Sequence, residues 1–190
     1  MEKKVILVGS SGVGKTSLLC RYIKDIFDES INKPTVGSSY SKVIVENTGG
    51  QGVELQVWDT AGQEKFRSVA SIFYRQAKIA LICFDYQDKD SINDIDQWAS
   101  SVSSIEPECV LYLVATKSDL LIDLSELKDF LEKKSSTFTS VFITSAKNNV
   151  GITEIFKTMA DQEVHTENKK NGIPIDPKKN GESQEEKKCC

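Results

Sequence analysis

Residues 5–16 read VILVGSSGVGKT, an apolar run followed directly by a loop with three glycines, a lysine and a threonine. Val5–Val8 is typical of a short buried strand, and the spacing of apolar residues in Lys15–Lys24 indicates a helix. Glycines let the loop between them curl so that several backbone N–H groups point at one anion, and the helix adds the positive end of its dipole. The stretch therefore predicts a polyphosphate-binding loop between the first strand and the first helix.

The residues that close this loop have the side chains that a nucleotide phosphate site needs. Lys15 would reach the β- and γ-phosphates, and the Thr16 hydroxyl would ligate Mg²⁺. A glycine-rich turn with an exposed lysine is the alternative, but the strand before the loop and the helix after it favour the phosphate site. The predicted nucleotide contacts in this segment are Ser11, Gly12, Val13, Gly14, Lys15, Thr16 and Ser17.

Short apolar runs and helical patterns alternate through most of the remaining chain. Residues 41–46 and 53–59 alternate apolar and polar side chains on either side of NTGGQG, which is typical of a hairpin. Ile79–Asp85 and Leu111–Thr116 are apolar almost throughout, as in strands buried on both faces. The pattern predicts an α/β fold: a six-stranded, mostly parallel sheet with one antiparallel edge strand and helices on both faces. The last strand is expected at Ser140–Ser145, and the later helices at 65–77, 91–105, 124–135 and 152–163.

The composition limits the kinds of partner and compartment. The chain has 190 residues and a formal net charge of −4, which argues against nucleic acid as a partner because phosphate backbones need a basic face. No apolar run approaches the roughly 18 residues of a membrane helix. We expect Cys20, Cys83 and Cys109 to be buried thiols in a reducing compartment. Residues 165–190 have almost no apolar side chains, so we expect them to be disordered.

Three further segments follow predicted strands, at the edge of a parallel sheet where ligands bind. In WDTAGQE, residues 58–64, Asp59 ends a strand and would stand near Mg²⁺. In TKSD, residues 116–119, a carboxylate can accept two N–H groups from guanine, a donor pair that adenine lacks. SAK, residues 145–147, follows the last strand. Each segment alone is compatible with an ordinary strand end, but their order and positions support one another.

Together, GSSGVGKT, WDTAGQEKF, TKSD and TSAK resemble the motifs of the Ras superfamily of small GTPases. Within it the chain is most similar to the Rab family. WDTAGQEKFRS followed by FYRQA resembles the Rab switch II segment, PTVGSSY resembles switch I, and the chain ends in Cys-Cys. The resemblance implies a P-loop NTPase of the small G domain type over residues 1–164. A hypervariable tail with a prenylation site would follow at 165–190.

The resemblance also implies a role for each matching residue around the phosphates. Thr35 would bind Mg²⁺ and the γ-phosphate in the GTP state, Asp59 would hold Mg²⁺ through water, and Gly62 would contact the γ-phosphate. Gln63 would position the hydrolytic water. The implied catalytic residues are thus Lys15, Thr35 and Gln63, and the implied metal site consists of Thr16, Thr35 and Asp59.

Around the base, Phe27 would pack against the guanine ring, Lys117 would lie along it and Asp119 would read its edge. Ala146 would offer its backbone N–H to the guanine oxygen, with support from Lys147. Thr116 and Ser145 complete the implied contacts with the nucleotide. An aromatic triad that Rab effectors recognise would be Tyr40, Trp58 and Phe73, for which ordinary core packing is the alternative.

As a Rab-like protein, the chain would bind GDP or GTP with Mg²⁺ and slowly hydrolyse GTP. Its implied partners are an exchange factor, a GTPase-activating protein, effectors, a prenylation escort and a GDP-dissociation inhibitor, with a monomeric G domain. Geranylgeranyl groups on Cys189 and Cys190 would anchor it to the cytoplasmic face of endomembranes, endosomes among them. It would act there in vesicle trafficking and cycle with the cytosol.

Several positions depart from the family pattern. Thr116 stands where most relatives have an asparagine that braces the phosphate loop and the base, and Gln76 stands where glycine is usual. The stretch from Phe27 to Thr35 is one residue longer than in typical Rabs. These departures leave open a Rho- or Ras-like signalling switch and a GTP-binding module with little or no hydrolysis. A P-loop kinase would need a lid with arginines. The sequence has only three arginines, none in a lid-like loop, which argues against this class.

Overall fold

The computed structural model describes residues 1–28, 35, 37–62 and 72–164. In this part of the chain, six strands form one sheet in the order β2-β3-β1-β4-β5-β6. β2 pairs antiparallel with β3, and the other neighbours are parallel. The predicted fold class is therefore confirmed. The strands are β1 (Glu2–Val8), β2 (Ser38–Glu46), β3 (Gly52–Thr60), β4 (Ile79–Asp85), β5 (Val110–Thr116) and β6 (Ser140–Ile143).

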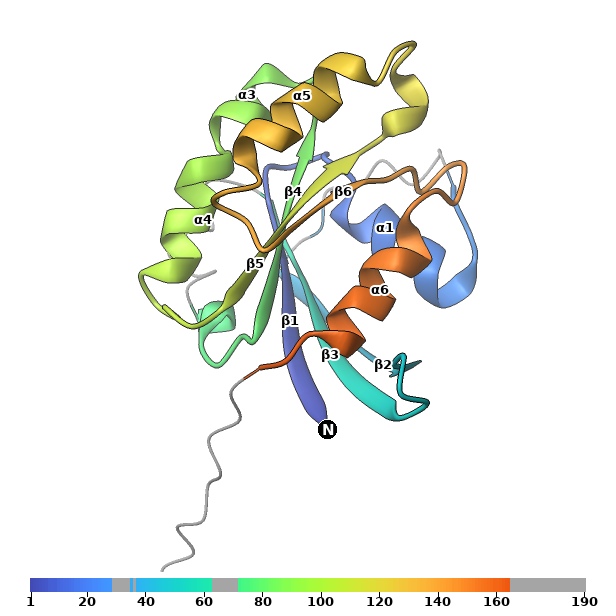
Figure 1. Ribbon diagram of the computed structural model, residues 1–190, viewed down its shortest axis with the longest axis vertical. Coiled ribbons are helices and arrows are strands. Elements are labelled where there is room, and N and C mark those ends of the chain that lie inside the picture. Colours follow the sequence, from blue (N-terminus) through green and yellow to red (C-terminus); the bar gives the residue numbers. More distant parts are fainter. Residues whose placement is uncertain (29–34, 36, 63–71, 165–190) are drawn as a thin grey trace, which may run out of the picture.

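Helices cover both faces of the sheet (Figure 1). α1 and α6 lie over one face, and α3, α4 and α5 lie over the other. No helix among the described residues is long and apolar enough to cross a membrane. The helices are α1 (Lys15–Lys24), α3 (Lys89–Asn93), α4 (Ile95–Ser103), the short 3₁₀ helix η2 (Ser118–Leu120), α5 (Ser125–Lys134) and α6 (Ile152–Asp161).

Each central strand contributes to two apolar cores. All seven residues of β4 are buried. Leu81 and Cys83 belong to the core under α1 and α6, whereas Ile82 and Phe84 belong to the core under α4 and α5. A strand that packs on both faces needs apolar side chains at successive positions, which explains the continuous run in the sequence.

The cysteine prediction is correct for Cys83 and Cys109 and wrong for Cys20. Burial raises the pKa of the Cys83 and Cys109 thiols to about 12, so both stay protonated at neutral pH. Cys20 lies on α1 and is only partly buried. The helical spacing of apolar residues placed it beside the buried face of α1, but not within it.

The first strand begins earlier than the predicted start at Val5, because Lys3 has a buried partner. Its ammonium group donates to the carbonyl oxygens of Met159 (2.9 Å), Ala160 (2.7 Å) and Gln162 (2.6 Å) at the end of α6. Lys3 is only 1% exposed, and burial lowers its pKa while Asp161 raises it in part. A charged residue is thus compatible with this strand because it caps a helix whose free carbonyls need donors.

Other boundaries differ by small amounts. The helix expected over 91–105 is divided by one turn residue, Asp94, into α3 and α4. β6 ends at Ile143 instead of Ser145. Of the helix expected over 65–77, residues 65–71 lie outside the described part, and residues 72–74 are helical.

Candidate functional site

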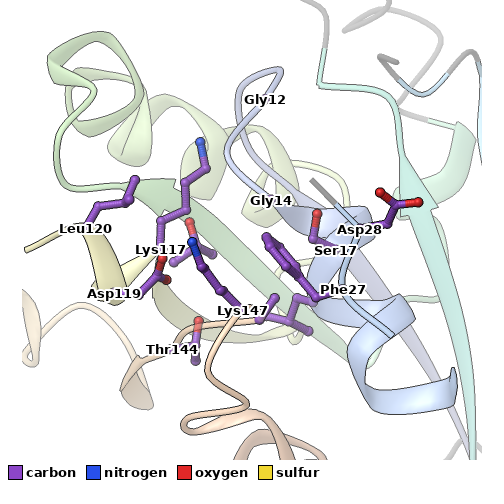
Figure 2. Close-up of a pocket in the computed structure, with 13 residues that line it drawn as sticks. Gly12, Gly14, Ser17, Phe27, Asp28, Lys117, Asp119, Leu120, Thr144 and Lys147 are labelled. Atoms are coloured by element: carbon purple, nitrogen blue, oxygen red, sulfur yellow. The ribbon is translucent and has the colours of Figure 1, made fainter. Parts of the chain in front are cut away.

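A cavity of about 460 Å³ opens at the carboxyl ends of the parallel strands. Figure 2 shows the loop with Gly12 and Gly14, and Phe27 beyond α1, on one side of it, with Lys117 and Asp119 on the other. These residues come from segments far apart in the sequence, and the topology brings them to one place. The lining residues are Gly12, Gly14, Ser17, Leu18, Phe27, Asp28, Thr116, Lys117, Asp119, Leu120, Thr144, Ala146 and Lys147.

The glycine-rich loop leaves no room for a side chain at its first position. Gly9 has φ 138°, and a Cβ there would lie 2.1 Å from the Cys83 carbonyl oxygen. A larger residue would therefore push the loop away from β4. At the far end of the loop, Gly14 is the N-cap of α1, with φ 101°. The backbone of the loop therefore leads directly into the helix N-terminus, as an anion site requires.

Lys15 is almost fully buried beneath the loop. Its Nζ donates to the carbonyl oxygens of Gly9 (2.7 Å) and Ser10 (2.9 Å). Burial lowers the pKa of Lys15, and the neighbouring Cys83 and Asp59 raise it in part. A Cβ on Gly62 would lie 2.5 Å from this Nζ and 2.5 Å from the Ser10 oxygen, so only glycine allows the chain after β3 to approach the loop so closely.

Three oxygen-bearing side chains meet beside Lys15. The Thr16 hydroxyl donates to Asp59 Oδ2 at 2.6 Å and lies 2.9 Å from the Thr35 hydroxyl. Asp59 is fully buried, and its Oδ1 has no hydrogen-bond partner within the described residues. Burial raises the pKa of Asp59, whereas the bond from Thr16 and the charge of Lys15 lower it. A carboxylate oxygen without a partner, beside two hydroxyls, fits a hard divalent cation such as Mg²⁺.

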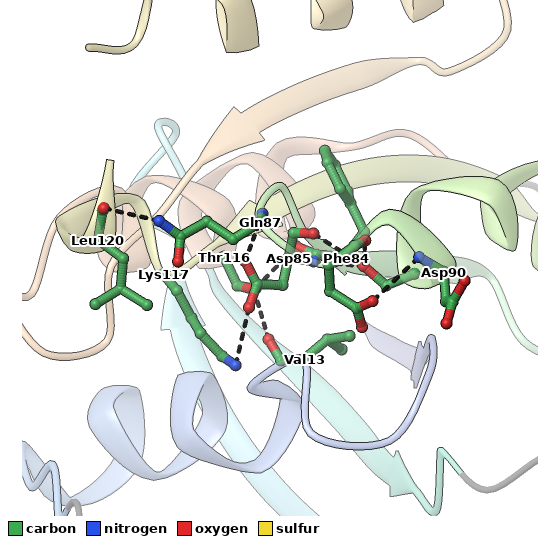
Figure 3. Close-up of polar contacts among 10 residues, drawn as sticks. Val13, Phe84, Asp85, Gln87, Asp90, Thr116, Lys117 and Leu120 are labelled. Carbon is green, nitrogen blue, oxygen red and sulfur yellow. Dashed lines mark hydrogen bonds and ion pairs between the residues drawn. The ribbon is translucent and has the colours of Figure 1, made fainter. Parts of the chain in front are cut away.

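Thr116 connects the end of β5 with the phosphate loop. Its hydroxyl lies within hydrogen-bond distance of the Val13 carbonyl oxygen and, at 2.9 Å, of the Phe84 carbonyl oxygen (Figure 3). A hydroxyl has one proton, so it can donate fully to only one of these two acceptors at a time.

Lys117 follows Thr116 in the left-handed conformation, with φ 54°. Its Nζ forms an ion pair with Asp85 Oδ2 at 3.0 Å (Figure 3). Lys117 is also among the cavity-lining residues. Asp85, at the end of β4, thus fixes the end of a lysine whose stem runs along the cavity wall.

Asp119 and Ser145 join two of the predicted motifs. The Ser145 hydroxyl donates to Asp119 Oδ1 at 2.5 Å, and it accepts a bond from the Asn148 backbone N–H at 3.0 Å. Ser145 is only 1% exposed. The bond leaves Asp119 Oδ2 and the second lone pair of Oδ1 for other donors, so the carboxylate is oriented while it keeps acceptor capacity.

Arg21 does not line the cavity, but it contacts the backbone of two residues that do, and the sequence motifs did not indicate it. It lies on α1, and its Nε donates to the Ala146 carbonyl oxygen at 2.6 Å. The two residues are far apart in the sequence, and Arg21 belongs to none of the recognised motifs. Only the topology, which packs α1 beside the loop after β6, could have indicated the contact.

The structure brings most of the predicted nucleotide contacts together. Nine of them line the cavity: Gly12, Gly14, Ser17, Phe27, Thr116, Lys117, Asp119, Ala146 and Lys147. Ser11, Val13, Lys15, Thr16, Thr35, Gly62 and Ser145 do not line it. Val13 and Ser145 contact the lining residues Thr116 and Asp119, whereas Lys15, Thr16, Thr35 and Gly62 form a separate group of contacts around Asp59 and the first residues of the loop. Gln63, Cys189 and Cys190 lie outside the described residues.

The three predicted effector-binding aromatics lie side by side on β2, β3 and the segment before β4. The ring centroids of Tyr40 and Trp58 are 5.2 Å apart, and those of Trp58 and Phe73 are 5.6 Å apart. Tyr40 is half exposed. Lys4 Nζ lies 5.4 Å from the Trp58 ring centre, within cation–π distance. The group is therefore neither fully buried core nor an isolated surface patch.

Comparisons with known proteins agree with this arrangement. A family model described as the Ras family matches residues 4–165. The chain belongs to the Ras family. It is similar to Ras-related protein Rab-31 of Rattus norvegicus, with 35% identity over 100% of this chain and 97% of that protein. Ras-related protein Rab-17 of Mus musculus is 40% identical over 84% of this chain and 74% of that protein.

A third relative is GTP-binding protein ypt1 of Schizosaccharomyces pombe, which is 37% identical over 84% of this chain and 78% of its own length. Because these relatives are Rab-named or GTP-binding proteins, we conclude that this member of the Ras family is a Rab-family small GTPase. The prediction of a Rab-family protein from the sequence motifs is thereby confirmed. Threonine at position 116 therefore does not indicate a Rho-like protein.

Proposed function

We propose that this chain is a Rab-like switch that binds GDP or GTP with Mg²⁺ in the 460 Å³ cavity and slowly hydrolyses GTP. The observation that carries the proposal is the convergence of three motifs, the phosphate loop, TKSD and SAK, on this one cavity. A loop of backbone N–H groups suits phosphates, and a carboxylate with free lone pairs suits the guanine edge.

At the phosphate end, Lys15 neutralises the β- and γ-phosphates while the loop backbone and the N-terminus of α1 bind them. Thr16, Thr35 and Asp59 would hold Mg²⁺, which when bound neutralises charge on the β- and γ-phosphate oxygens. Gly62 brings a backbone N–H to the γ-phosphate, and Gln63 orients the attacking water. The supporting observations are that Asp59 Oδ1 has no hydrogen-bond partner in the described part of the chain and that Gly62 approaches Lys15 closely.

At the base end, Asp119 accepts two N–H groups of guanine while Ser145 orients its carboxylate. The Ala146 backbone N–H binds the guanine oxygen. Lys117, with its end held by Asp85, lies along one face of the base, and Phe27 packs against it. Adenine has neither the matching donor pair nor the matching acceptor, so the site rejects it.

The switch follows from the state of the γ-phosphate. Thr35 and Gly62 hold their segments only while that phosphate is present, and hydrolysis releases both. No described arginine lies at the phosphate end to act in cis, so a GTPase-activating protein would raise the rate by about 10³–10⁵-fold. Effectors would read the GTP state through the surface around Tyr40, Trp58 and Phe73.

The remaining assignments concern the membrane and the partners there. A G domain over 1–164, monomeric, would be tethered by the tail over 165–190 to the cytoplasmic face of endomembranes for vesicle trafficking. Geranylgeranyl groups on Cys189 and Cys190 would hold it there, and a prenylation escort and a GDP-dissociation inhibitor would carry it. An exchange factor would reload it. These assignments rest on the terminal Cys-Cys and on the similarity to Rab-named proteins.

The first experiment is to identify the nucleotide that the purified chain carries. The protein is purified without added nucleotide and denatured, and the released material is separated by chromatography. GDP or GTP at close to one per chain is the expected result. An adenine nucleotide, or a chain that neither carries nor takes up any guanine nucleotide, would contradict the proposal.

A further inference from the structure

Arg21 projects from α1 towards the loop that follows β6. Its Nε donates to the Ala146 carbonyl oxygen at 2.6 Å, and Nη2 lies 3.3 Å from the Lys147 carbonyl oxygen. The Arg21 side chain is only 14% exposed, and its bond to Ala146 is partly buried, whereas the bond to Lys147 lies at the surface. Hydrogen bonds from a charged donor are roughly twice as strong as those between neutral groups. One guanidinium group thus fixes two successive carbonyls of the SAK loop.

The other arm of Arg21 holds the end of its own helix. Nη1 donates to the backbone oxygen of Asp25 at 2.9 Å and to Asp25 Oδ1 at 3.0 Å. Asp25 is the C-cap of α1 in the left-handed conformation, with φ 53°. Asn149 Nδ2 lies 3.4 Å from the same Oδ1, which adds a second connection to the loop after β6. The chain therefore leaves α1 in a direction that this group of contacts holds in place.

Both segments that Arg21 connects form walls of the cavity. Ala146 and Lys147 line it from the β6 side, and Phe27 lines it two residues after Asp25. A planar guanidinium presents its donors in fixed directions, whereas a lysine ammonium is a point charge on a flexible stem. Arg21 can therefore set the distance between the two walls in a way that a lysine cannot.

We propose that Arg21 is a positioning residue for the guanine base. It fixes the SAK loop against the exit of α1, and so sets how tightly the base is held and how slowly GDP leaves. This inference rests on the proposed function of the cavity as a guanine-nucleotide site. Arg21 touches neither phosphate-end group, Lys15 nor Asp59, so its effect belongs to nucleotide release and not to the chemical step.

The test measures release of a fluorescent GDP analogue from the full chain with Mg²⁺ present. Arg21→Met removes every donor, and release is expected to become about tenfold faster or more, as loss of charged hydrogen bonds implies. Arg21→Lys should recover only part of this. Lys24→Met, at an exposed position of the same helix, is the matched control and should release the analogue at the wild-type rate.

Two further measurements separate positioning from loss of structure. Single-turnover hydrolysis of bound GTP by the Arg21→Met chain should stay within about twofold of wild type, because the phosphate end is untouched. Adding Arg21→Met to Phe27→Ala should speed release less than the product of the two single effects, since both act on the same walls. If the effects of the two mutations on the release rate simply multiply, or if Arg21→Met slows hydrolysis, Arg21 has a general structural role instead.

The outcomes also separate this inference from the proposed function. If the wild-type chain retains no guanine nucleotide, the proposed function fails and the inference fails with it. If the wild-type chain retains the analogue and Arg21→Met releases it at the same rate, only the inference fails. If Arg21→Met folds poorly, Asp25→Asn is the second variant. Asp25 is exposed, and asparagine in its place removes the negative charge that pairs with the Arg21 guanidinium. This variant should speed release by a few-fold.

Discussion

At the scale of single residues, Thr116 has one hydroxyl proton and two buried carbonyl acceptors, those of Val13 and Phe84. Thr116→Val removes the proton at nearly constant shape and leaves both oxygens without this donor. Since the one proton serves one acceptor at a time, one hydrogen bond worth about 1–3 kcal/mol is lost, and GDP release should become about tenfold faster. Thr116→Asn supplies two amide protons and should slow release below the wild-type rate. Stopped-flow fluorescence measures both, and unchanged release in the valine variant would contradict the argument.

Asp59 carries the second prediction at this scale, which concerns metal removal. Its Oδ1, which has no hydrogen-bond partner among the residues that the structure describes, fits a divalent cation, so chelating Mg²⁺ with EDTA should speed GDP release from the wild-type chain. Asp59→Asn removes the charge, and its release should be fast both with and without EDTA. Asp96→Asn is the control, since Asp96 lies on the surface of α4, pairs with Lys134 away from the cavity, and should keep the response to EDTA. A full EDTA response in Asp59→Asn would exclude the proposed metal site.

At the scale of elements, Lys3 ties β1 to the end of α6. Lys3→Met fills similar volume but leaves three carbonyl oxygens without their charged donor, and the free energy of unfolding should fall by about 2–4 kcal/mol. Lys42→Met, on the exposed surface of β2, removes an ion pair with Glu54 and should lower the free energy of unfolding far less, because surface ion pairs contribute little. Urea unfolding at saturating GDP compares the two. Equal losses would mean that the α6 carbonyls find other donors.

The elements also show how far the sequence could predict the structure. Runs such as Ile79–Asp85 predicted strands correctly because two-sided burial demands apolar residues at every position. The motif residues could be predicted as one group because most of them follow the carboxyl end of a strand, where ligands of a parallel sheet bind. The start of β1 was missed because the partners of Lys3 belong to α6, and the contact of Arg21 with Ala146 was missed for the same reason. A local sequence pattern reflects the burial of its own segment. Contacts between segments far apart in the sequence can be predicted only once the topology of the fold is known.

At the scale of the whole molecule, the phosphate and base ends of the cavity should be separable by mutation. Gln63→Leu removes the group that we propose orients the attacking water, so single-turnover GTP hydrolysis should fall by about tenfold or more, as loss of a positioning group implies. GDP release should stay near the wild-type rate, because the residues that line the base end are intact. If the mutation leaves hydrolysis unchanged, Gln63 has no role in it. If the wild-type chain itself does not hydrolyse bound GTP, a nucleotide-binding module without this chemistry becomes the better description.

The proposed attachment of the molecule to membranes would depend on charge and lipid in the residues after the G domain. From Asp161 to Lys188 the sequence has six lysines and seven acidic residues, so no net positive charge supports binding to anionic lipid. One lipid chain gives marginal, reversible binding, and stable anchoring needs a second signal. We therefore expect both Cys189 and Cys190 to need a geranylgeranyl group.

Cys189→Ser and Cys190→Ser, each prenylated once, should remain mostly in the supernatant when sedimented with vesicles, while the doubly prenylated wild type pellets. Equal pelleting of a single variant would show that one lipid suffices, and the tail would then have to contact the membrane by other means.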